Sequence, residues 1–501
     1  MATNSEHSIV NSALAKDRLG AGGVAQFALT AAAPLLVVAG LVTTGWAVTG
    51  VTGIPAGFIA LAAIFAIFAV GYLAMARRIV NAGALYTYVA AGLGRPAGLA
   101  TATVTLLAYS ALQVGLYGAL GPVTADLMHT QFGWNLSWWV YSLTAWALVA
   151  ILGVLRVDLN SRILAILLTA EVLLVVVITV VGLANPAGGN LSFSTLAPSN
   201  LITAGSAVAL AIAVTGFIGF EQAPVYAEES RNPRRTVPIA TYAALALMTV
   251  LYAGASWAMS VTAGPDAIVD AAREHPTDLM FFLAAPHLGD NIGTIGAILF
   301  ISSMFAGLLA YHNAVARYAF ALGREQVLWR GFGRTALRTS APITASVVQS
   351  VTGLGVILVY ALAGWNPMVQ LFFWGGTTGA LGILLALTAT SAAVIAYFAR
   401  VGGAESVWQK IIAPAIATVA LAVVIWWTLT NYSTLLGVEP GTVWAWALPT
   451  AYAVAAAIGA GWALILAGTR RDVYEGIGRG VNTSSDDLEV TSGVPVGGVR
   501  R

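Results

Sequence analysis

The sequence contains no cysteine. This absence excludes a disulfide framework, a thiolate metal site and catalysis by a thiol. The only histidines are His7, His129, His275, His287 and His312, which form no close ligand pair along the chain. We therefore expect no bound metal and no cofactor.

Charge is also scarce, because charged residues make up 9% of the chain and hydrophobic residues 58%. An ordinary soluble domain carries roughly a quarter charged residues. The net charge of +2 is small and the basic residues are scattered, so we expect no nucleic-acid partner. This composition indicates a protein of the lipid bilayer.

Several sequence patterns are missing as well. There is no phosphate-binding GxxxxGK[ST] loop and no Ser, His and Asp set at the spacing of a hydrolase, so we do not expect an enzyme. Strand-like alternation is absent, which favours helices over a barrel. The first twenty or so residues lack the apolar core of a signal peptide, so the N-terminus is expected to stay in the cytoplasm.

Long apolar stretches dominate the rest of the chain, each near or above the ~20 residues that cross a bilayer. We predict an all-α polytopic membrane protein with twelve transmembrane helices at 24–46, 53–76, 97–125, 137–155, 160–184, 203–229, 237–261, 291–322, 343–364, 369–399, 408–430 and 443–468.

The Arg and Lys residues test this topology, because they favour the cytoplasmic side. With the N-terminus inside, only Arg273 of the 23 basic residues falls outside, in the connection 262–290. Dropping one helix from the prediction would reverse the side of every later connection. We expect both termini in the cytoplasm and a multi-pass protein of the cell membrane. The predominance of Arg over Lys is typical of a GC-rich bacterial genome.

Two predicted helices carry residues that break helices. The first has Pro34 within it and Gly40 shortly after, and the sixth has Gly216, Gly219 and Pro224. Proline removes an intrahelical hydrogen bond, and glycine costs about 1 kcal/mol relative to alanine in a helix. Broken helices in corresponding positions of two repeats mark the binding site of a transporter. The alternative is a pair of kinked helices that pack closely through small residues.

Acidic residues inside the apolar stretches are rare and costly. Glu171 lies ~14 Å along the fifth helix from Arg162, near the membrane midplane, and it could load and release a proton. The alternative is a neutral carboxyl that bonds a neighbouring helix for structural reasons. Glu221 could meet a cationic group of a substrate, although we favour a cap on the second half of its helix.

Adjacent hydroxyls at Ser302 and Ser303 in the eighth helix could supply oxygens to a sodium ion. Serine in a membrane helix more often bonds its own backbone. The run from Glu228 and Glu229 to Arg231, Arg234 and Arg235 is expected to anchor the inner end of the sixth helix and to form part of an inner gate.

Three stretches resemble amino acid permeases of the amino acid, polyamine and organocation superfamily. They are "GFIGFEQAPVYAEESRNPRRTVPIA" (216–240), "NAGALYTYVAAGLGRPAG" (81–98) and "NAVARYAFALGREQVLW" (313–329). The resemblance implies a leucine-transporter-type inverted repeat of five plus five helices with two peripheral helices. In this division, a cytoplasmic tail (1–23) precedes the first repeat (24–184), and an external loop (185–202) leads to the second repeat (203–399). The peripheral helices (400–468) and a second cytoplasmic tail (469–501) follow.

The resemblance also implies where a substrate lies. Its carboxylate would meet free amides at about Val37 to Gly40 in the first helix, and its ammonium would meet free carbonyls at about Val214 to Phe217 in the sixth. Phe217 or Phe220 could close over the substrate. Tyr109 and Tyr117 could line the pocket, the alternative being that they serve helix packing. The implied substrate site comprises Pro34, Val37, Val38, Ala39, Gly40, Tyr109, Val214, Thr215, Gly216, Phe217, Gly219, Phe220 and Glu221. The stretch "APLLVVAG" departs from the Gly, small, Gly run that many members carry in the first helix.

A proton-coupled branch of the family has a lysine in the fifth helix, at or near the position of Glu171. We therefore expect a secondary transporter of an amino acid, coupled to protons, that works by alternating access. The alternatives are an amine or polyamine carrier, an exchanger, or sodium coupling. A membrane-embedded enzyme or receptor without flux is the competing class, and the oligomeric state stays open.

Overall fold

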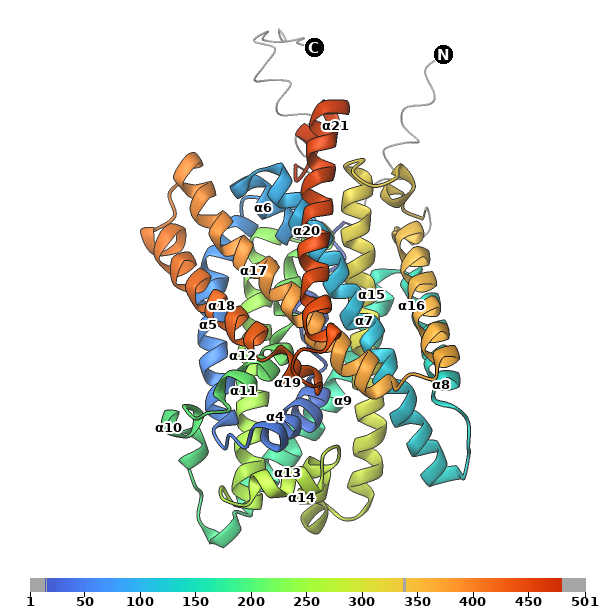
Figure 1. The fold of residues 1–501 in the computed structure, drawn as a ribbon, viewed down its shortest axis with the longest axis vertical. Helices are drawn as coiled ribbons and strands as arrows, with labels where there is room; N and C mark the ends of the chain where they lie inside the picture. Colours follow the sequence, from blue (N-terminus) through green and yellow to red (C-terminus); the bar gives the residue numbers. More distant parts are fainter. Residues whose placement is uncertain (1–13, 15, 337–338, 480–501) are drawn as a thin grey trace, which may run out of the picture.

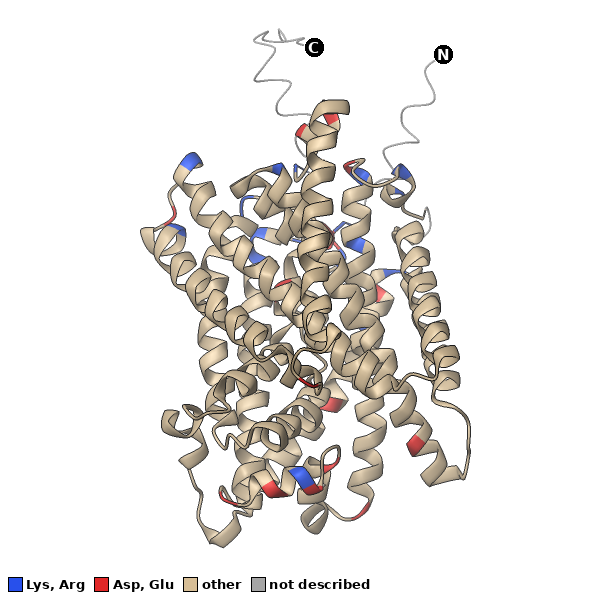
Figure 2. Ribbon diagram, viewed as in Figure 1, with Lys and Arg blue, Asp and Glu red and all other residues tan. Residues whose placement is uncertain are grey.

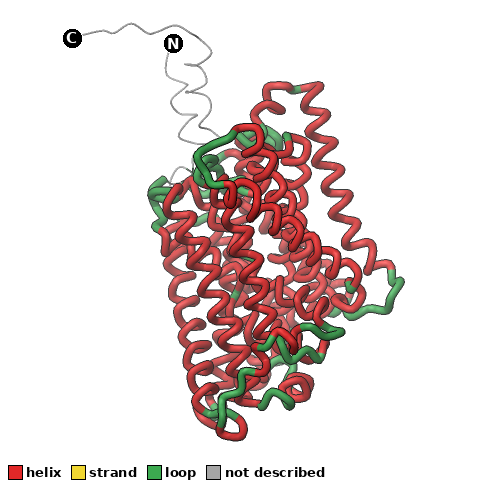
Figure 3. Tube along the Cα trace, turned by 90° about the vertical axis from the view of Figure 1, so that its left-hand side faces the viewer, coloured by secondary structure: helices red, strands yellow, loops and turns green. Residues whose placement is uncertain are grey.

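The computed structural model describes residues 14, 16–336 and 339–479. The predicted tails, 1–23 and 469–501, lie partly outside the described residues. Arg338, Arg500 and Arg501 lie wholly outside them. The described chain is helical and contains no β-strand, apart from one isolated parallel bridge between Leu19 and Ser230. Figure 3 shows helices over nearly the whole length of the molecule, with loops gathered at its two ends.

Eleven described segments are long and apolar enough to cross a membrane, and α8 makes a twelfth, shorter crossing. Several crossings consist of more than one element. In chain order the elements are α2 (Ala21–Ala32), α3 (Pro34–Leu36), η1 (Val37–Leu41) and α4 (Val42–Thr49); α5 (Ile54–Ala76); α7 (Arg95–Phe132); α8 (Trp138–Gly153); α9 (Val157–Ala184); α11 (Ser206–Phe217) and η4 (Phe220–Glu229); α12 (Pro233–Ala263); α15 (Asn291–Arg324); α16 (Ile343–Ala363); η6 (Pro367–Phe373) and α17 (Trp374–Val401); η7 (Trp408–Ile412) and α18 (Ala413–Thr430); and α20 (Val443–Thr469).

Short helices occupy the connections (Figure 1). They are α6 (Leu85–Leu93), η2 (Ala187–Gly189), η3 (Ser194–Leu196), α10 (Pro198–Leu201), α13 (Ile268–Glu274), α14 (Leu279–Leu288), η5 (Arg330–Gly333), α19 (Tyr432–Leu436) and α21 (Arg471–Gly476). Hydropathy alone did not separate α13 and α14 from the connection 262–290, because their apolar faces are short.

Charge divides the two ends of the molecule. Figure 2 shows most Lys and Arg residues at the end that carries α6 and α21, which we call the basic end. Arg273 lies in the last turn of α13, at the opposite end. At the basic end, the Arg78 guanidinium donates two hydrogen bonds to Glu405 and lowers the pKa of that carboxyl below its ordinary value. Arg78 thus links the end of α5 to the connection between α17 and η7.

The first membrane helix is interrupted at Ala33. This residue adopts φ 48° and ψ 71°, and Pro34 begins the next helical segment without an N–H to donate. Val37 then donates its N–H to the Ala33 carbonyl over 3.1 Å, and η1 adds one turn with i to i+5 bonding, so Val42 donates to the Val37 carbonyl. The amide of Val37, the first of the predicted free amides from Val37 to Gly40, is therefore already bonded. Proline breaks this helix, and Gly40 is accommodated within η1.

The sixth membrane helix is interrupted directly after the predicted carbonyls 214–217. Ile218 is extended and Gly219 has φ 131°, a conformation open essentially to glycine alone. A Cβ atom on Gly219 would lie 2.6 Å from the Ala28 carbonyl oxygen. The two interruptions therefore pack directly against each other, and their contact requires this glycine.

Replacing Gly219 by alanine is expected to destabilise the protein by about 1–3 kcal/mol, because the φ angle and the contact with α2 both disfavour a Cβ atom. Gly254→Ala in α12 is the matched control, since a Cβ atom there meets nothing within 4 Å. Thermal unfolding of the purified variants in detergent makes the comparison. Equal melting temperatures for the two variants would contradict the constraint at Gly219.

Candidate substrate and coupling sites

A cavity of about 100 Å³ lies beside the two interruptions. It is bordered by the first, third, sixth, eighth and tenth membrane helices and by α19. Its lining residues are Ala31, Ala32, Ala33, Leu36, Val37, Leu41, Thr44, Val48, Leu112, Gly115, Leu116, Ala211, Ile212, Thr215, Tyr311, Phe372, Phe373, Gly376, Thr377, Thr434 and Leu435. Because α4 and α19 lie towards the end opposite the basic end in Figure 1, the cavity extends in that direction.

The cavity contains two residues of the predicted substrate site, Val37 and Thr215. Pro34, Val38, Ala39 and Val214 are buried and do not line it, and neither does Gly40, whose Cβ atom would face Leu36 and Phe300. A Cβ atom on Gly216 would lie 2.8 Å from the Val37 side chain, so Gly216 serves the packing of the sixth helix on the first.

The aromatic residues expected to cover a substrate face elsewhere. Phe217 packs against Phe58, Phe65 and Tyr252, and Phe220 packs against Phe65 and Phe68. This aromatic cluster joins the sixth helix to α5 and α12. Neither Phe217 nor Phe220 lines the cavity, because both side chains are held in the cluster.

Glu221 holds the sixth-helix interruption together. Its carboxylate accepts a hydrogen bond from the Gly219 N–H over 2.8 Å and from the Tyr109 hydroxyl over 2.9 Å. The Tyr72 hydroxyl donates to the Glu221 carbonyl. Glu221 is fully buried, and both of its carboxyl oxygens accept these bonds, so its geometry is that of a cap. Tyr109 is committed to this carboxyl, while Tyr117 is buried and its carbonyl accepts a bond from Ser142.

Glu171 reaches the other interruption. It is fully buried in α9, and its Oε2 accepts a hydrogen bond from the Leu35 N–H over 3.3 Å. Leu35 directly follows Pro34, so this amide is one that the restart of a helix leaves free. The Ser303 hydroxyl neighbours the carboxyl. Glu171 Oε1 and Ser303 Oγ have no hydrogen-bond partner among the described residues.

The two serines of the predicted sodium site differ in their surroundings. Ser303 is buried beside Glu171, whereas Ser302 donates to the Leu299 carbonyl of its own helix over 2.9 Å. No group of three or more His, Cys, Asp or Glu side chains that could hold a metal ion occurs in the described part of the chain.

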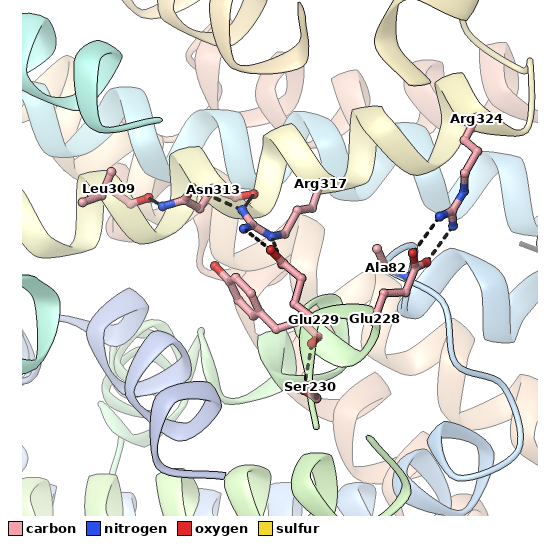
Figure 4. A network of polar contacts seen from close by, with 9 residues as sticks. Ala82, Glu228, Glu229, Ser230, Leu309, Asn313, Arg317 and Arg324 are labelled. Atoms are coloured by element: carbon pink, nitrogen blue, oxygen red, sulfur yellow. Dashed lines mark hydrogen bonds and ion pairs between the residues drawn. The ribbon is translucent and has the colours of Figure 1, made fainter. Parts of the chain in front are cut away.

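At the basic end, the acidic pair after the sixth helix binds arginines of α15 (Figure 4). Arg317 donates to Glu229 through Nε over 2.6 Å and through Nη2 over 3.0 Å, and their side chains are 3% and 2% exposed. Arg324 donates two bonds of 2.6 Å to Glu228. The network thus joins η4 to α15 through two bidentate ion pairs.

Further contacts tie the chain ends of two other helices to this network. The backbone N–H groups of Arg18 and Leu19, just before α2, donate to the Glu229 carbonyl, each over 3.0 Å. The Ala82 N–H, before α6, donates to Glu228 Oε1 over 2.9 Å. The three recognised sequence stretches therefore meet at the basic end.

The three arginines that follow Glu229 in the sequence have a different environment from the ion-paired arginines of α15. Arg231, Arg234 and Arg235 are exposed, and none forms an ion pair within the described residues. Arg231 donates its backbone N–H to the Leu19 carbonyl over 3.0 Å. Their exposure agrees with a role in anchoring this end of the chain.

Sequence reasoning missed Ala33, Tyr311 and Gly376 in the cavity and the arginine partners in the network. A signal for the arginines was present, because residues seven apart, such as Arg317 and Arg324, share one face of a helix. Facing the pair Glu228 and Glu229, they form two ion pairs. Nothing in the local sequence around Tyr311 or Gly376 singles them out, because only the packing of distant helices brings them to the cavity.

Comparisons with known proteins agree with this architecture. A stretch of 196 residues is 27% identical to the Arabidopsis thaliana protein "Cationic amino acid transporter 4, vacuolar", covering 39% of this chain and 29% of that protein, so the match spans less than a third of the relative's length. Two mutant structures of the Eremococcus coleocola manganese transporter align with TM-scores of 0.57 and 0.55, at 13% and 14% identity, over 94% of this chain and 99% of theirs.

These structures establish the fold, which is of the leucine-transporter type as the sequence predicted. The family model described as "Amino acid permease" matches residues 22–458. That range includes both helix interruptions, the cavity and the ion pairs of Glu228 and Glu229. The chain therefore belongs to the amino acid permease family, within the amino acid, polyamine and organocation superfamily.

Proposed function

We propose that the protein is a secondary transporter that carries an amino acid across the cell membrane by alternating access around the interruptions at Ala33 and Gly219. The observation that carries this proposal is the cavity, which lies at both interruptions, while the Glu228 and Glu229 pairs hold the basic end shut. From the name of the plant relative we take only that the substrate is an amino acid.

The substrate carboxylate is proposed to bind at the restart of the first helix, near Leu36 and Val37, where the positive end of the helix dipole favours an anion. The ammonium group is proposed to bind near Thr215, at the end of α11, where the last carbonyl oxygens of a helix lose their helical partners. The Thr215 carbonyl itself accepts a bond from the Ile218 N–H over 3.3 Å. Val37 and Thr215 both line the cavity. The other predicted residues of the two helices are proposed to support these positions by packing beside them, outside the cavity.

The basic end is proposed to face the cytoplasm, because Arg and Lys concentrate on that side of membrane proteins. The cavity then extends outwards, and the ion pairs of Arg317 and Arg324 form the inner gate. Opening towards the cytoplasm requires η4 to separate from α15, with rupture of both pairs. Arg231, Arg234 and Arg235 stay at the cytoplasmic surface throughout.

Proton coupling is proposed to operate through Glu171. Its hydrogen bond from Leu35 connects the charge on the carboxyl directly to the interruption that binds the substrate. Loss of that charge weakens the bond to Leu35, because charge-assisted hydrogen bonds are roughly twice as strong as neutral ones. Sodium coupling through Ser303 is the alternative, and Ser302 contributes less to it because its hydroxyl bonds its own helix.

The variant Glu171→Gln is expected to abolish amino acid accumulation driven by a pH gradient, because glutamine keeps the size of the side chain but carries no exchangeable charge. Exchange of labelled for unlabelled substrate should persist. The measurement is uptake into proteoliposomes with an imposed pH gradient, and Glu439→Gln, an exposed position outside the membrane helices, is the matched control. Undiminished accumulation by Glu171→Gln, or uptake that requires sodium instead, would overturn the coupling role.

The inner gate predicts a change in accessibility that a chain without cysteine reports cleanly. In a Thr30→Cys background, which places the cysteine at a buried position of α2, Glu229→Gln should raise labelling by an impermeant maleimide from the cytoplasmic side by at least about tenfold. Breaking a buried ion pair costs about 3–5 kcal/mol in the closed state, and each ~1.4 kcal/mol is a factor of ten. Glu228→Gln, at the more exposed pair, serves as a second variant if the first folds poorly. An unchanged labelling rate in both would rule out these pairs as the gate.

A further inference from the structure

Every polar group on the cavity wall is neutral. Among the described residues that line the cavity, none is Asp, Glu, Lys, Arg or His. The polar side chains are the hydroxyls of Thr44, Thr215, Thr377, Thr434 and Tyr311. The rest of the wall is aliphatic or aromatic, so the wall offers a substrate's side chain van der Waals contact and a few hydroxyls.

The nearest buried carboxyls are committed elsewhere. Glu221 binds Gly219 and Tyr109, and the Tyr109 ring packs against Tyr311 with 6.0 Å between ring centroids. Tyr311 lines the cavity whereas Tyr109 and Glu221 do not, so Tyr109 and Tyr311 separate this carboxyl from a bound molecule. Glu171 is fully buried and bonds Leu35. Neither carboxyl lines the cavity, so the wall itself offers no counter-charge to a cationic side chain.

We infer that the transporter is selective for amino acids with neutral, mainly apolar side chains and excludes those with charged ones. This inference rests on the proposed function and narrows its substrate. Moving a charged group out of water into a wall without a counter-charge is strongly unfavourable. An apolar side chain gains from the same transfer, in proportion to the surface that it buries.

Gly376 sets the size of the accepted side chain. It lines the cavity from α17, and a Cβ atom there would meet nothing within 4 Å. On α7, which packs against this segment, a Cβ atom on Gly115 would lie 3.2 Å from the Leu371 carbonyl oxygen, so that position is closed by backbone. The free space at Gly376 is therefore the part of the cavity that a single substitution fills without strain in the fold.

The test of selectivity is competition for uptake by the purified protein in proteoliposomes, with labelled alanine and leucine as probes. Unlabelled neutral amino acids should compete for uptake. Lysine, arginine and glutamate should need concentrations about 100-fold or more higher for the same inhibition. Saturable uptake of lysine or arginine with a kcat/KM equal to that of leucine would overturn the inference and leave amino acid transport intact. No uptake or exchange of any amino acid would instead contradict the proposed function itself.

The test of the size limit compares Gly376→Val with Gly355→Val. Position 355 in α16 has equal room for a Cβ atom but lies outside the cavity. Gly376→Val should raise the KM for leucine by roughly tenfold relative to that for alanine, since apolar pockets resolve about one methylene by such a factor. Gly355→Val should leave the ratio unchanged. If correctly folded Gly376→Val leaves the ratio of the two KM values unchanged, Gly376 does not set the size of the accepted side chain.

Discussion

Backbone N–H and C=O groups inside a bilayer must find partners within the protein, and the rest of this structure depends on that constraint. The first helix is interrupted at Ala33 and the sixth at Gly219, and each freed segment is met by a buried carboxyl. Glu171 accepts a bond from Leu35, and Glu221 accepts one from Gly219. The same unwound backbone that would destabilise an ordinary membrane helix thereby becomes a polar surface beside a cavity.

The interruptions also connect that surface to the basic end of the molecule. The sixth helix continues from Gly219 through η4 into Glu228 and Glu229, whose ion pairs reach α15. The Glu229 carbonyl accepts bonds from the residues just before α2. The contacts of η4 with α15 and with the residues before α2 therefore join the interrupted helices to the basic end. In this account, substrate binding and gate opening are coupled through one short helix.

The sequence predicted the fold class well because hydropathy and the distribution of arginine are summed over many residues, and α8 is shorter than its predicted span by only a few residues. The interruptions were also predictable, since Pro34 and Gly219 act locally. The break itself falls at Ala33, which the sequence did not single out, because Pro34 and Gly40 were the two helix breakers named there. The cavity wall was harder still: Phe217 and Phe220 turn towards α5, whereas Tyr311 and Gly376 arrive from distant helices, and only tertiary packing decides such directions.

The central claim, that the cavity between the interrupted helices is the substrate site, is tested most directly by protection of a single cysteine. In the variant Thr215→Cys, labelling by an impermeant maleimide from the outside reports access to the cavity at the end of α11. The account predicts that a transported neutral amino acid slows this labelling in proportion to its occupancy, while lysine does not. Labelling that proceeds at the same rate with saturating transported substrate would contradict it, because the substrate would then bind elsewhere.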